Sequence, residues 1–563
     1  MPERTSAHLI LDLLVAAGVD RIFGIPGGPL LSLLTALDAR PEITFVLAKH
    51  EEGAVFMAEG HAQATGRLGV ACVTSGPGTT HALTAAASAT ADWAPVLVLA
   101  GQVSTEVYGR GGLQDSSGGN WSIDTVDVFR SAVKLVAQVS DPAQVPLLVE
   151  RAIRTAMSPL PGAALLVLPS NILNSPAAPA PEADLPGHEL QADYPGAPAA
   201  RALTEVANAL LAARTPVILA GQGAKVSGSG PLLVALAERL AAPVATTMKG
   251  KSVFPEDHAL SLGVFGNYGG SPATHQFVLS DGVDLLLVVG SSLGEVSTFG
   301  WDPALAHGRT VCQIDADGLQ IGKNYRVDHA IVADARTALA GLLDLLPSGE
   351  PAPQRSPVIA TGAIVAPQQH PLRASAVAVL LSRRLPTNVL LFLDNGNTLC
   401  WIGEHYKAPG EADLFCSLNF GCMGYAIPAS IGAKLALPAR PVVAVVGDAA
   451  FAMGGMEIHT AVELDLPIVW LVLNNRGNAM VANLQELMFG TAAGSMYTRP
   501  LDAAMVARGL GAQARSASTL PELDEALSVA FADGGPWMID ITVDAHEIPW
   551  SLTRRAAILG GAE

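Results

Sequence analysis

The segment VVAVVGDAA, residues 442–450, and the segment IVWLVLNNRG, residues 468–477, share one pattern. Each begins with an uninterrupted apolar run and ends abruptly in polar residues. Such short apolar runs are typical of strands that are buried on both faces of a parallel sheet. The pattern places Asp448 and Asn475 at the carboxyl ends of two strands, the edge where parallel sheets bind ligands. The two segments therefore predict an α/β fold with a binding site at this edge.

The same pattern recurs along the whole chain, with helical sequence between the apolar runs. We expect strands at residues 45–48, 69–74, 96–100 and 164–168; at 217–220, 244–246, 285–289 and 311–314; and at 389–393, 442–446, 468–473 and 537–541. Two segments rich in Pro and Ala, residues 176–200 and 347–374, read as linkers. The sequence therefore predicts three doubly wound parallel-sheet domains, at residues 1–175, 201–346 and 375–563.

Composition excludes several classes of partner. The 563 residues include 33 basic and 51 acidic ones, so the net charge is 33 − 51 = −18, which argues against nucleic acid and anionic membranes. The longest apolar runs stop after about eight residues, whereas a membrane-spanning helix needs roughly 20. Five scattered cysteines and an N-terminus without an export signal favour the cytoplasm. We therefore expect a cytoplasmic protein that binds small molecules.

Asp448 and Asn475 form a candidate metal site. If their strands are neighbours joined by one helix, the carboxylate and the amide oxygen lie close together and leave room for phosphate oxygens and water. Proteins usually hold Mg²⁺ beside a diphosphate with such hard oxygen ligands. Each residue alone is also a common turn residue, but the pair at this spacing favours the metal.

Gly447-Asp448-Ala449, followed after 24 residues by Asn474-Asn475, resembles the signature of thiamine-diphosphate enzymes. The resemblance implies thiamine diphosphate and Mg²⁺ as cofactors, with Asp448, Asn475 and the Gly477 carbonyl as metal ligands. It implies further cofactor contacts from Gly396, Asn397, Thr398, Gly421, Met423, Ala449 and Ala450. Met423 alone reads as core filler, but its place between two glycines favours a position under the thiazolium ring. The resemblance also identifies the three predicted domains, in chain order, as pyrimidine-binding, central and diphosphate-binding.

The segment KHEEGA, residues 49–54, supplies a candidate catalytic acid. Taken alone, its two carboxylates suit the N-terminus of a helix. With FGIPGG at residues 23–28 and TSGPG at 74–78, the segment resembles the pyrimidine-binding domain of the acetolactate-synthase branch. The resemblance implies that Glu51 activates the cofactor by proton exchange, and that Gly28 and Gln114 belong to the catalytic site.

His81 and the segment 116–122 depart from the branch's pattern. His81 stands where these synthases usually carry Asn, so it is either a hydrogen-bonded structural residue or a proton donor near the substrate. The segment 116–122 looks longer than the usual connection and is either an inserted surface loop or a wall specific to the substrate.

The resemblance implies decarboxylation of a 2-oxo acid, expected to be pyruvate, and transfer of the resulting acyl carbanion to an aldehyde or ketone acceptor. The alternative is a 2-oxo acid decarboxylase that releases an aldehyde. In this family the pyrimidine domain of one subunit meets the diphosphate domain of another, which implies a homodimer or homotetramer. A catalytically silent binding subunit is disfavoured, because Glu51, Asp448 and Asn475 are all present.

Two departures bear on FAD and on the acceptor. Acetolactate synthases carry an Asp-Asp-Arg segment where this chain has Gly290-Ser291-Ser292-Leu293-Gly294-Glu295, and a Trp where it has Leu484. That Arg contacts both the flavin and the second keto acid. FAD is therefore the disfavoured alternative, and the identity of the acceptor stays open.

Overall fold

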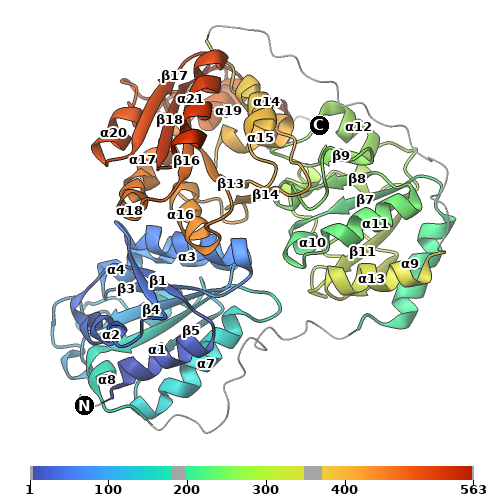
Figure 1. Ribbon diagram of the computed structural model, residues 1–563. Helices are drawn as coiled ribbons and strands as arrows, with labels where there is room; N and C mark the ends of the chain where they lie inside the picture. Colours follow the sequence, from blue (N-terminus) through green and yellow to red (C-terminus); the bar gives the residue numbers. More distant parts are fainter. Residues whose placement is uncertain (1–3, 179–196, 348–370, 561–563) are drawn as a thin grey trace.

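The computed structural model describes residues 4–178, 197–347 and 371–560 and contains three six-stranded sheets, one in each block (Figure 1). Every strand pairing within these sheets is parallel, and helices flank the sheets. The predicted fold class, three doubly wound α/β domains, is confirmed.

The first sheet has the strand order β2-β1-β3-β4-β6-β5. Its strands are β1 Arg21–Gly24, β2 Thr44–Leu47, β3 Gly69–Val73, β4 Val96–Gln102, β5 Leu135–Gln138 and β6 Ala163–Pro169. Its helices are α1 Ser6–Ala16, α2 Leu31–Leu37, α3 Glu51–Thr65, α4 Pro77–His81, α5 Leu83–Ala91, α6 Thr125–Phe129, α7 Val145–Ala156 and α8 Ser170–Asn174.

The second sheet has the order β12-β11-β10-β7-β8-β9. Its strands are β7 Pro216–Ala220, β8 Val244–Thr246, β9 Ser261–Val264, β10 Leu285–Val289, β11 Thr310–Asp315 and β12 His329–Val332. Its helices are α9 Ala200–Ala212, α10 Gln222–Val226, α11 Gly230–Leu240, α12 Pro272–Val278 and α13 Ala335–Leu345.

The third sheet has the order β14-β13-β15-β16-β18-β17. Its strands are β13 Leu390–Leu393, β14 Asp413–Cys416, β15 Val442–Gly447, β16 Ile468–Asn474, β17 Gln513–Ala517 and β18 Trp537–Thr542. Its helices are α14 Ala374–Arg384, α15 Asn397–His405, α16 Ala426–Ala436, α17 Asp448–Gly454, α18 Ile458–Glu463, α19 Ala479–Phe489, α20 Ala503–Gly509, α21 Leu520–Asp533 and α22 Trp550–Leu559.

The register of β15 and β16 positions the predicted metal ligands. Val442 pairs with Ile468 and Gly447 pairs with Leu473, so both strands end at the same level of the sheet. The apolar residues Val442–Val446 are buried throughout, as are those of β16. Their continuous burial explains the uninterrupted apolar runs in the sequence.

The predicted linkers, residues 176–200 and 347–374, lie largely outside the described residues. At the edge of the first linker, Pro176 forms a bridge with Thr5, and the Ala177 N–H donates to the Arg4 carbonyl at 2.8 Å. Residues 176 and 177 are thus attached to the first domain. The remaining boundaries stay predictions.

Helices α3 and α16 join the first and third domains within one chain (Figure 1). A Cβ atom at Gly432 would lie 1.8 Å from the Met57 carbonyl oxygen, and one at Gly60 would lie 2.0 Å from that of Ala429. Only glycine permits two backbones to approach this closely. The first and third domains of a chain are therefore in close backbone contact.

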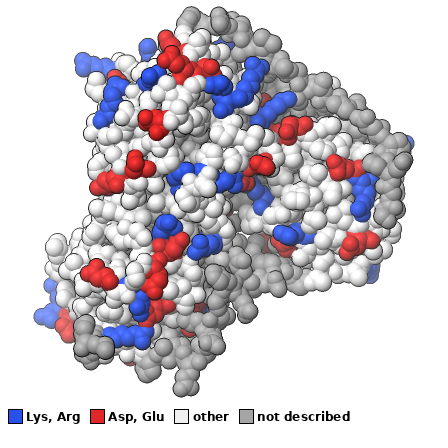
Figure 2. Space-filling model, viewed as in Figure 1, with Lys and Arg blue, Asp and Glu red and all other residues white. Residues whose placement is uncertain are grey.

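No helix in the described parts of the chain is long and apolar enough to cross a bilayer. On the face shown in Figure 2, basic side chains lie in small groups interleaved with acidic ones.

Candidate active site

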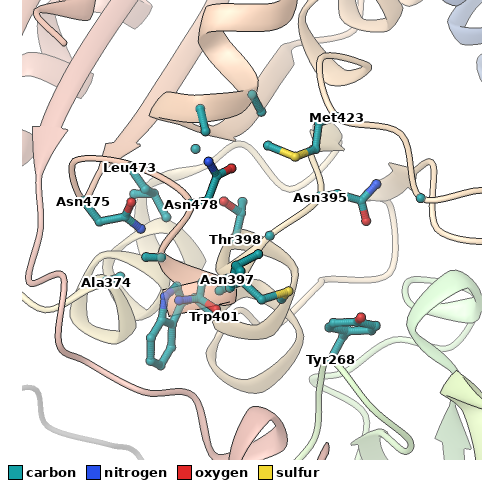
Figure 3. A pocket seen from close by; sticks show the side chains of 18 of the residues that line it. Tyr268, Ala374, Asn395, Asn397, Thr398, Trp401, Met423, Leu473, Asn475 and Asn478 are labelled. Carbon is teal, nitrogen blue, oxygen red and sulfur yellow. The ribbon is translucent and has the colours of Figure 1, made fainter. Parts of the chain in front are cut away.

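One cavity of about 400 Å³ collects most of the residues predicted to bind the cofactor (Figure 3). Nine of them line it: Gly396, Asn397, Thr398, Gly421, Met423, Ala449, Ala450, Asn475 and Gly477. They come from four loops at the carboxyl edge of the third sheet, where β13, β14, β15 and β16 end. The structure thus brings together residues that are far apart in the sequence.

The loop after β13 leads into the N-terminus of α15. Gly396 caps this helix with φ +121°, a backbone conformation that L side chains rarely adopt. Asn397 and Thr398 follow as the first residues of the helix, and the Asn397 amide donates to Asn483 Oδ1 at 2.8 Å. A helix N-terminus that opens onto a cavity presents unpaired N–H groups to an anion. The geometry suits a diphosphate.

Asp394 organises the loops on either side of the cavity. Its carboxylate is fully buried and accepts backbone N–H groups from Asn395 at 2.9 Å, Gly424 at 3.0 Å and Ala426 at 2.9 Å. Burial raises the pKa of Asp394 to about 6, although the N–H donors favour its charged form. The carboxylate therefore fixes the loop that carries Met423 against the loop that precedes α15.

Three oxygen atoms converge where β15 and β16 end. With the Asn475 amide turned so that its oxygen faces this point, that oxygen lies 3.0 Å from the Gly477 carbonyl oxygen and 3.1 Å from Asp448 Oδ1, whereas in the opposite orientation its NH₂ group donates to both. For octahedral Mg²⁺ with ligands at about 2.1 Å, neighbouring oxygens stand about 3 Å apart. The second carboxylate oxygen, Asp448 Oδ2, is buried without a hydrogen-bond partner. This donor set fits a divalent cation.

Asp448 itself lies beneath the cavity floor and is fully buried. Burial raises its pKa to about 6, while backbone N–H groups of Gly477 and Ala449 act in the opposite direction. A nearby cation would favour the charged carboxylate, because opposite charges attract strongly in a buried site.

Glu51 and His81 form a second group of predicted site residues, in the first domain. Glu51 starts α3 and is 9% exposed. His81 Nδ1 lies 3.0 Å from Glu51 Oε2, and the His81 ring stacks on His50 with centroids 4.5 Å apart. Burial, together with His81, lowers the pKa of His50. The contact makes His81 a direct partner of the predicted catalytic acid.

Glu52 also lies in the first turn of α3, so both carboxylates are stabilised by the positive end of the helix dipole. Burial raises the pKa of Glu52. The two differ in their hydrogen bonds, since the Glu51 carboxylate pairs with His81 Nδ1, whereas the Glu52 N–H donates to His50 Nδ1.

Gln114 lies beside the TSGPG loop, with Oε1 3.5 Å from Ser75 Oγ. Its φ of +62° is unusual for a residue with a side chain and indicates local strain. Gly28 starts the short 3₁₀ helix Gly28–Leu30, and a Cβ atom there would meet nothing within 4 Å. In the segment predicted to be a surface loop or a substrate wall, Trp121 is fully exposed. Its indole ring is covered by none of the described residues of the same chain.

The cavity and the Glu51 group are separate in a single chain. The residues that line the cavity begin at Tyr268, and none belongs to the first domain. Sequence reasoning missed several of them, including Tyr268 and Val296 of the second domain, and Trp401 and Arg555 of the third. Trp401 sits one helical turn after the Gly396-Asn397-Thr398 motif, which could have indicated it.

Comparison with known proteins gives the same class of enzyme as the fold and the site. Family models for the N-terminal, central and C-terminal domains of thiamine pyrophosphate enzymes match residues 4–120, 203–342 and 394–541. The chain belongs to the thiamine pyrophosphate enzyme family, which confirms the resemblance and the thiamine cofactor.

Within this family the chain lies in the acetolactate-synthase-like branch. It is 31% identical to a probable acetolactate synthase large subunit of Methanocaldococcus jannaschii, over 96% of this chain and 92% of that one. It is also 31% identical to the large subunit of acetolactate synthase isozyme 3 of Escherichia coli K12, over 97% and 96%. A crystal structure of a thiamin diphosphate-dependent enzyme from Mycobacterium smegmatis matches with a TM-score of 0.82 and 26% identity, over 96% of this chain and 100% of that one.

Proposed function

We propose that this protein uses thiamine diphosphate and Mg²⁺ to decarboxylate pyruvate and to join the remaining two-carbon unit to a carbonyl acceptor. The observation that carries this proposal is the convergence of Asp448, Asn475 and Gly477 oxygens beside an anion-binding helix N-terminus. The relatives named acetolactate synthases support ligation over simple aldehyde release.

Each group of the site has a task in this proposal. Asp448, Asn475 and the Gly477 carbonyl hold Mg²⁺, while the start of α15 and residues Ala449 and Ala450 of α17 contact the diphosphate. Gly421 and Met423 bound the space for the thiazolium ring. When bound, thiamine diphosphate supplies the electron sink that decarboxylation needs, which no protein side chain provides.

The first domain contributes the proton chemistry. Glu51 exchanges a proton with the cofactor, and His81, 3.0 Å away, orients the carboxylate and can take part in the exchange. Gln114 stands next to the TSGPG loop, where its amide can hydrogen-bond a substrate oxygen. Gly28 leaves open space on the same side.

The active unit in this proposal is at least a homodimer. The cavity lacks a wall from the first domain of its own chain, so Glu51 of one chain must face the cavity of another. Large apolar side chains that are exposed in the single chain support this arrangement, since exposed apolar surface is typical of an interface. They include Leu113 and Trp121 of the first domain, and Phe420, Met453 and Met456 of the third.

We further propose that the enzyme works without FAD. The segment Gly290–Glu295 contains no cation, so it lacks the arginine with which the resemblance implies that related synthases contact the flavin. The visible absorption spectrum of the purified protein tests this directly. A flavin band that persists through dialysis would contradict the proposal.

The decisive test of function follows the fate of labelled pyruvate. Purified enzyme with thiamine diphosphate and Mg²⁺ should release CO₂ and form acetolactate, or a ligated product when an aldehyde is added. Exclusive release of acetaldehyde would favour the decarboxylase instead.

Two neighbouring carboxylates provide a matched pair of variants for the proposed proton exchange. Glu51→Gln should lower kcat by about 10²–10⁴-fold, the usual contribution of acid–base catalysis. Glu52→Gln removes the adjacent carboxylate of the same helix turn and should leave kcat within about twofold. Equal losses in both variants would contradict the role of Glu51.

A further inference from the structure

Arg555, on the C-terminal helix α22, reaches the cavity. It is the only cation among the described residues that line this cavity. Three carboxylates line it as well, Glu295, Asp544 and Glu547, and Glu547 is already engaged by the Ser375 N–H and hydroxyl. Arg555 is therefore the single positive side chain available there to an anionic substrate group.

The guanidinium of Arg555 has unused donors. It makes no hydrogen bond with any other described residue, and its Nη1 atom is buried without a partner. Its nearest carboxylate oxygen, Glu295 Oε1, is 3.6 Å away, beyond hydrogen-bond distance, and the group lies over the Tyr268 ring at 5.3 Å. A guanidinium carries five N–H donors, and buried donors rarely lack partners. Donors left unpaired in a cavity indicate a ligand.

Arg555 is not needed to hold α22 in place, because other residues of the helix attach it to its neighbours. Arg554, its neighbour, donates to Asp302 Oδ2 at 2.9 Å and stacks over Phe299. At the start of the helix, the N–H groups of Trp550 and Ser551 donate to the Glu404 carboxylate. The helix is thus held to both the second and the third domain, and Arg555 is presented to the cavity.

The position of Arg555 points to the acceptor side of the site. It faces Glu295, at the end of the segment Gly290–Glu295, where the resemblance to acetolactate synthases implies an arginine that contacts the second keto acid. Building on the proposed function, we propose that Arg555 binds the carboxylate of a 2-oxo acid acceptor, taking from a different element the role of the missing arginine. A planar carboxylate matches the fork of a guanidinium in a bidentate pair.

Glu295 has a defined part in this arrangement. Among the described residues, its carboxylate is the only one within 4 Å of the guanidinium, and it competes with the acceptor for the same charge. Removing that charge should strengthen the binding of a carboxylate, whereas removing Arg555 should weaken it.

The test compares product partition in the holoenzyme supplied with labelled pyruvate. In Arg555→Gln, the ratio of acetolactate to CO₂ should fall by about 10–100-fold, the range expected for a lost charge-assisted hydrogen bond. CO₂ release should persist, and acetoin formation from added acetaldehyde, which has no carboxylate, should stay within about twofold. Arg555→Lys should recover part of the ratio, and Glu295→Gln should lower the pyruvate concentration that gives half of the maximal rate of acetolactate formation. Arg554→Gln is the matched control and should leave the ratio unchanged.

Arg555 could pair with the carboxylate of the acceptor or with the diphosphate of the cofactor. The affinity of the enzyme for the cofactor distinguishes these two cases. Titration of thiamine diphosphate, followed by the fluorescence of Trp401 in the cavity wall, should give equal dissociation constants for wild type and Arg555→Gln. Weaker cofactor binding with an unchanged product ratio would assign Arg555 to the diphosphate and overturn the proposal. An Arg555→Gln variant without any change would overturn it as well.

Failure of the proposed function is distinguishable from failure of this inference. A wild-type enzyme that ligates only aldehydes would retain the function and overturn the role of Arg555. If the wild type ligates nothing, calorimetric titration of the holoenzyme with oxamate, an unreactive 2-oxo acid analogue, decides the inference alone. The proposed role of Arg555 is supported if Arg555→Gln weakens oxamate binding by at least about tenfold, and it is contradicted if oxamate binding is unchanged.

Discussion

At the scale of single residues, the amide of Asn475 decides how the site is interpreted. With a nitrogen at the converging position, its contacts to Gly477 and Asp448 would be ordinary hydrogen bonds. With the oxygen there, it lies about 3 Å from two other oxygens, and a bound cation makes that arrangement favourable. The orphaned Asp448 Oδ2 agrees with the second interpretation, since it leaves lone pairs for a metal or its water ligands.

Removing the charge of Asp448 should therefore act on the metal first. We expect Asp448→Asn to weaken the binding of Mg²⁺ by more than about 100-fold, because a direct ligand counts for more than an outer-shell partner. Calorimetric titration of Mg²⁺ in the presence of thiamine diphosphate measures this effect. Asp544→Asn, which removes a carboxylate from the same cavity outside the oxygen cluster, is the control and should bind Mg²⁺ normally.

At the scale of elements, the loop that carries Met423 depends on Asp394. Both of its oxygens accept backbone N–H groups, so Asp394→Asn would turn an amide NH₂ toward an N–H donor. We expect a loss of about 1–3 kcal/mol in the free energy of unfolding, and weaker cofactor binding, because a buried donor loses its partner. Urea unfolding measures the first effect. Asp413→Asn, at a half-exposed ion pair with Arg440, should cost less than about 1 kcal/mol.

Glu457, in the 3₁₀ turn Gly455–Glu457, links the third domain to the start of α3. It accepts the N–H groups of Lys49 at 3.0 Å and His50 at 2.9 Å, and it is buried. Burial raises its pKa from 4.5 to about 6, so the folded state binds this proton more tightly than the unfolded state. This contribution to stability is full below pH 4.5 and is lost as the pH rises through 6.

The loss amounts to about 2 kcal/mol, since each pKa unit corresponds to about 1.4 kcal/mol. Glu457→Gln does not titrate, so the free energy of unfolding of wild type minus that of the variant should decrease by this amount between pH 4.5 and 7. Urea unfolding of both proteins across this range gives the difference and cancels the titration of other groups. A difference that is flat with pH would contradict the raised pKa.

The strands show how far sequence patterns reach. All twelve expected strands form, but β1, β5, β9, β12, β14 and β17 were not predicted. Five of these six lie at sheet edges, where β5 is only half-buried and β17 is mostly exposed. Edge strands need not be apolar on both faces, so they lack the continuous run on which the prediction depends. β1 is central but only four residues long.

Site residues that belong to local sequence motifs could be predicted from the sequence. Site residues that only tertiary packing brings to the cavity could not. Asp448 and Asn475 follow adjacent strands in matched register, so their meeting follows from the sequence once the strands are identified. Arg555 and Tyr268 reach the cavity from the last helix and from another domain. No local pattern encodes that approach.

At the scale of the whole molecule, the packing of α3 on α16 fixes the first domain against the third. The backbone contacts at Gly60 and Gly432 allow little adjustment, because carbonyl oxygens occupy the space of a Cβ atom. In this arrangement the first domain contributes no wall to the cavity of its own chain. In the proposed homodimer, the first domain of a second chain completes the site.

Pairing two inactive chains tests this requirement. Glu51→Gln and Asp448→Asn should each abolish acetolactate formation, because every site in either homodimer carries a defect. A heterodimer, co-expressed with two different tags and purified through both, should regain about half of the wild-type rate, since one of its two sites combines an intact Glu51 with an intact Asp448. Pairing Glu51→Gln with the double variant is the control and should stay inactive. If each chain built its own site, both pairings would be inactive alike, so recovery in the first alone identifies a site shared between chains.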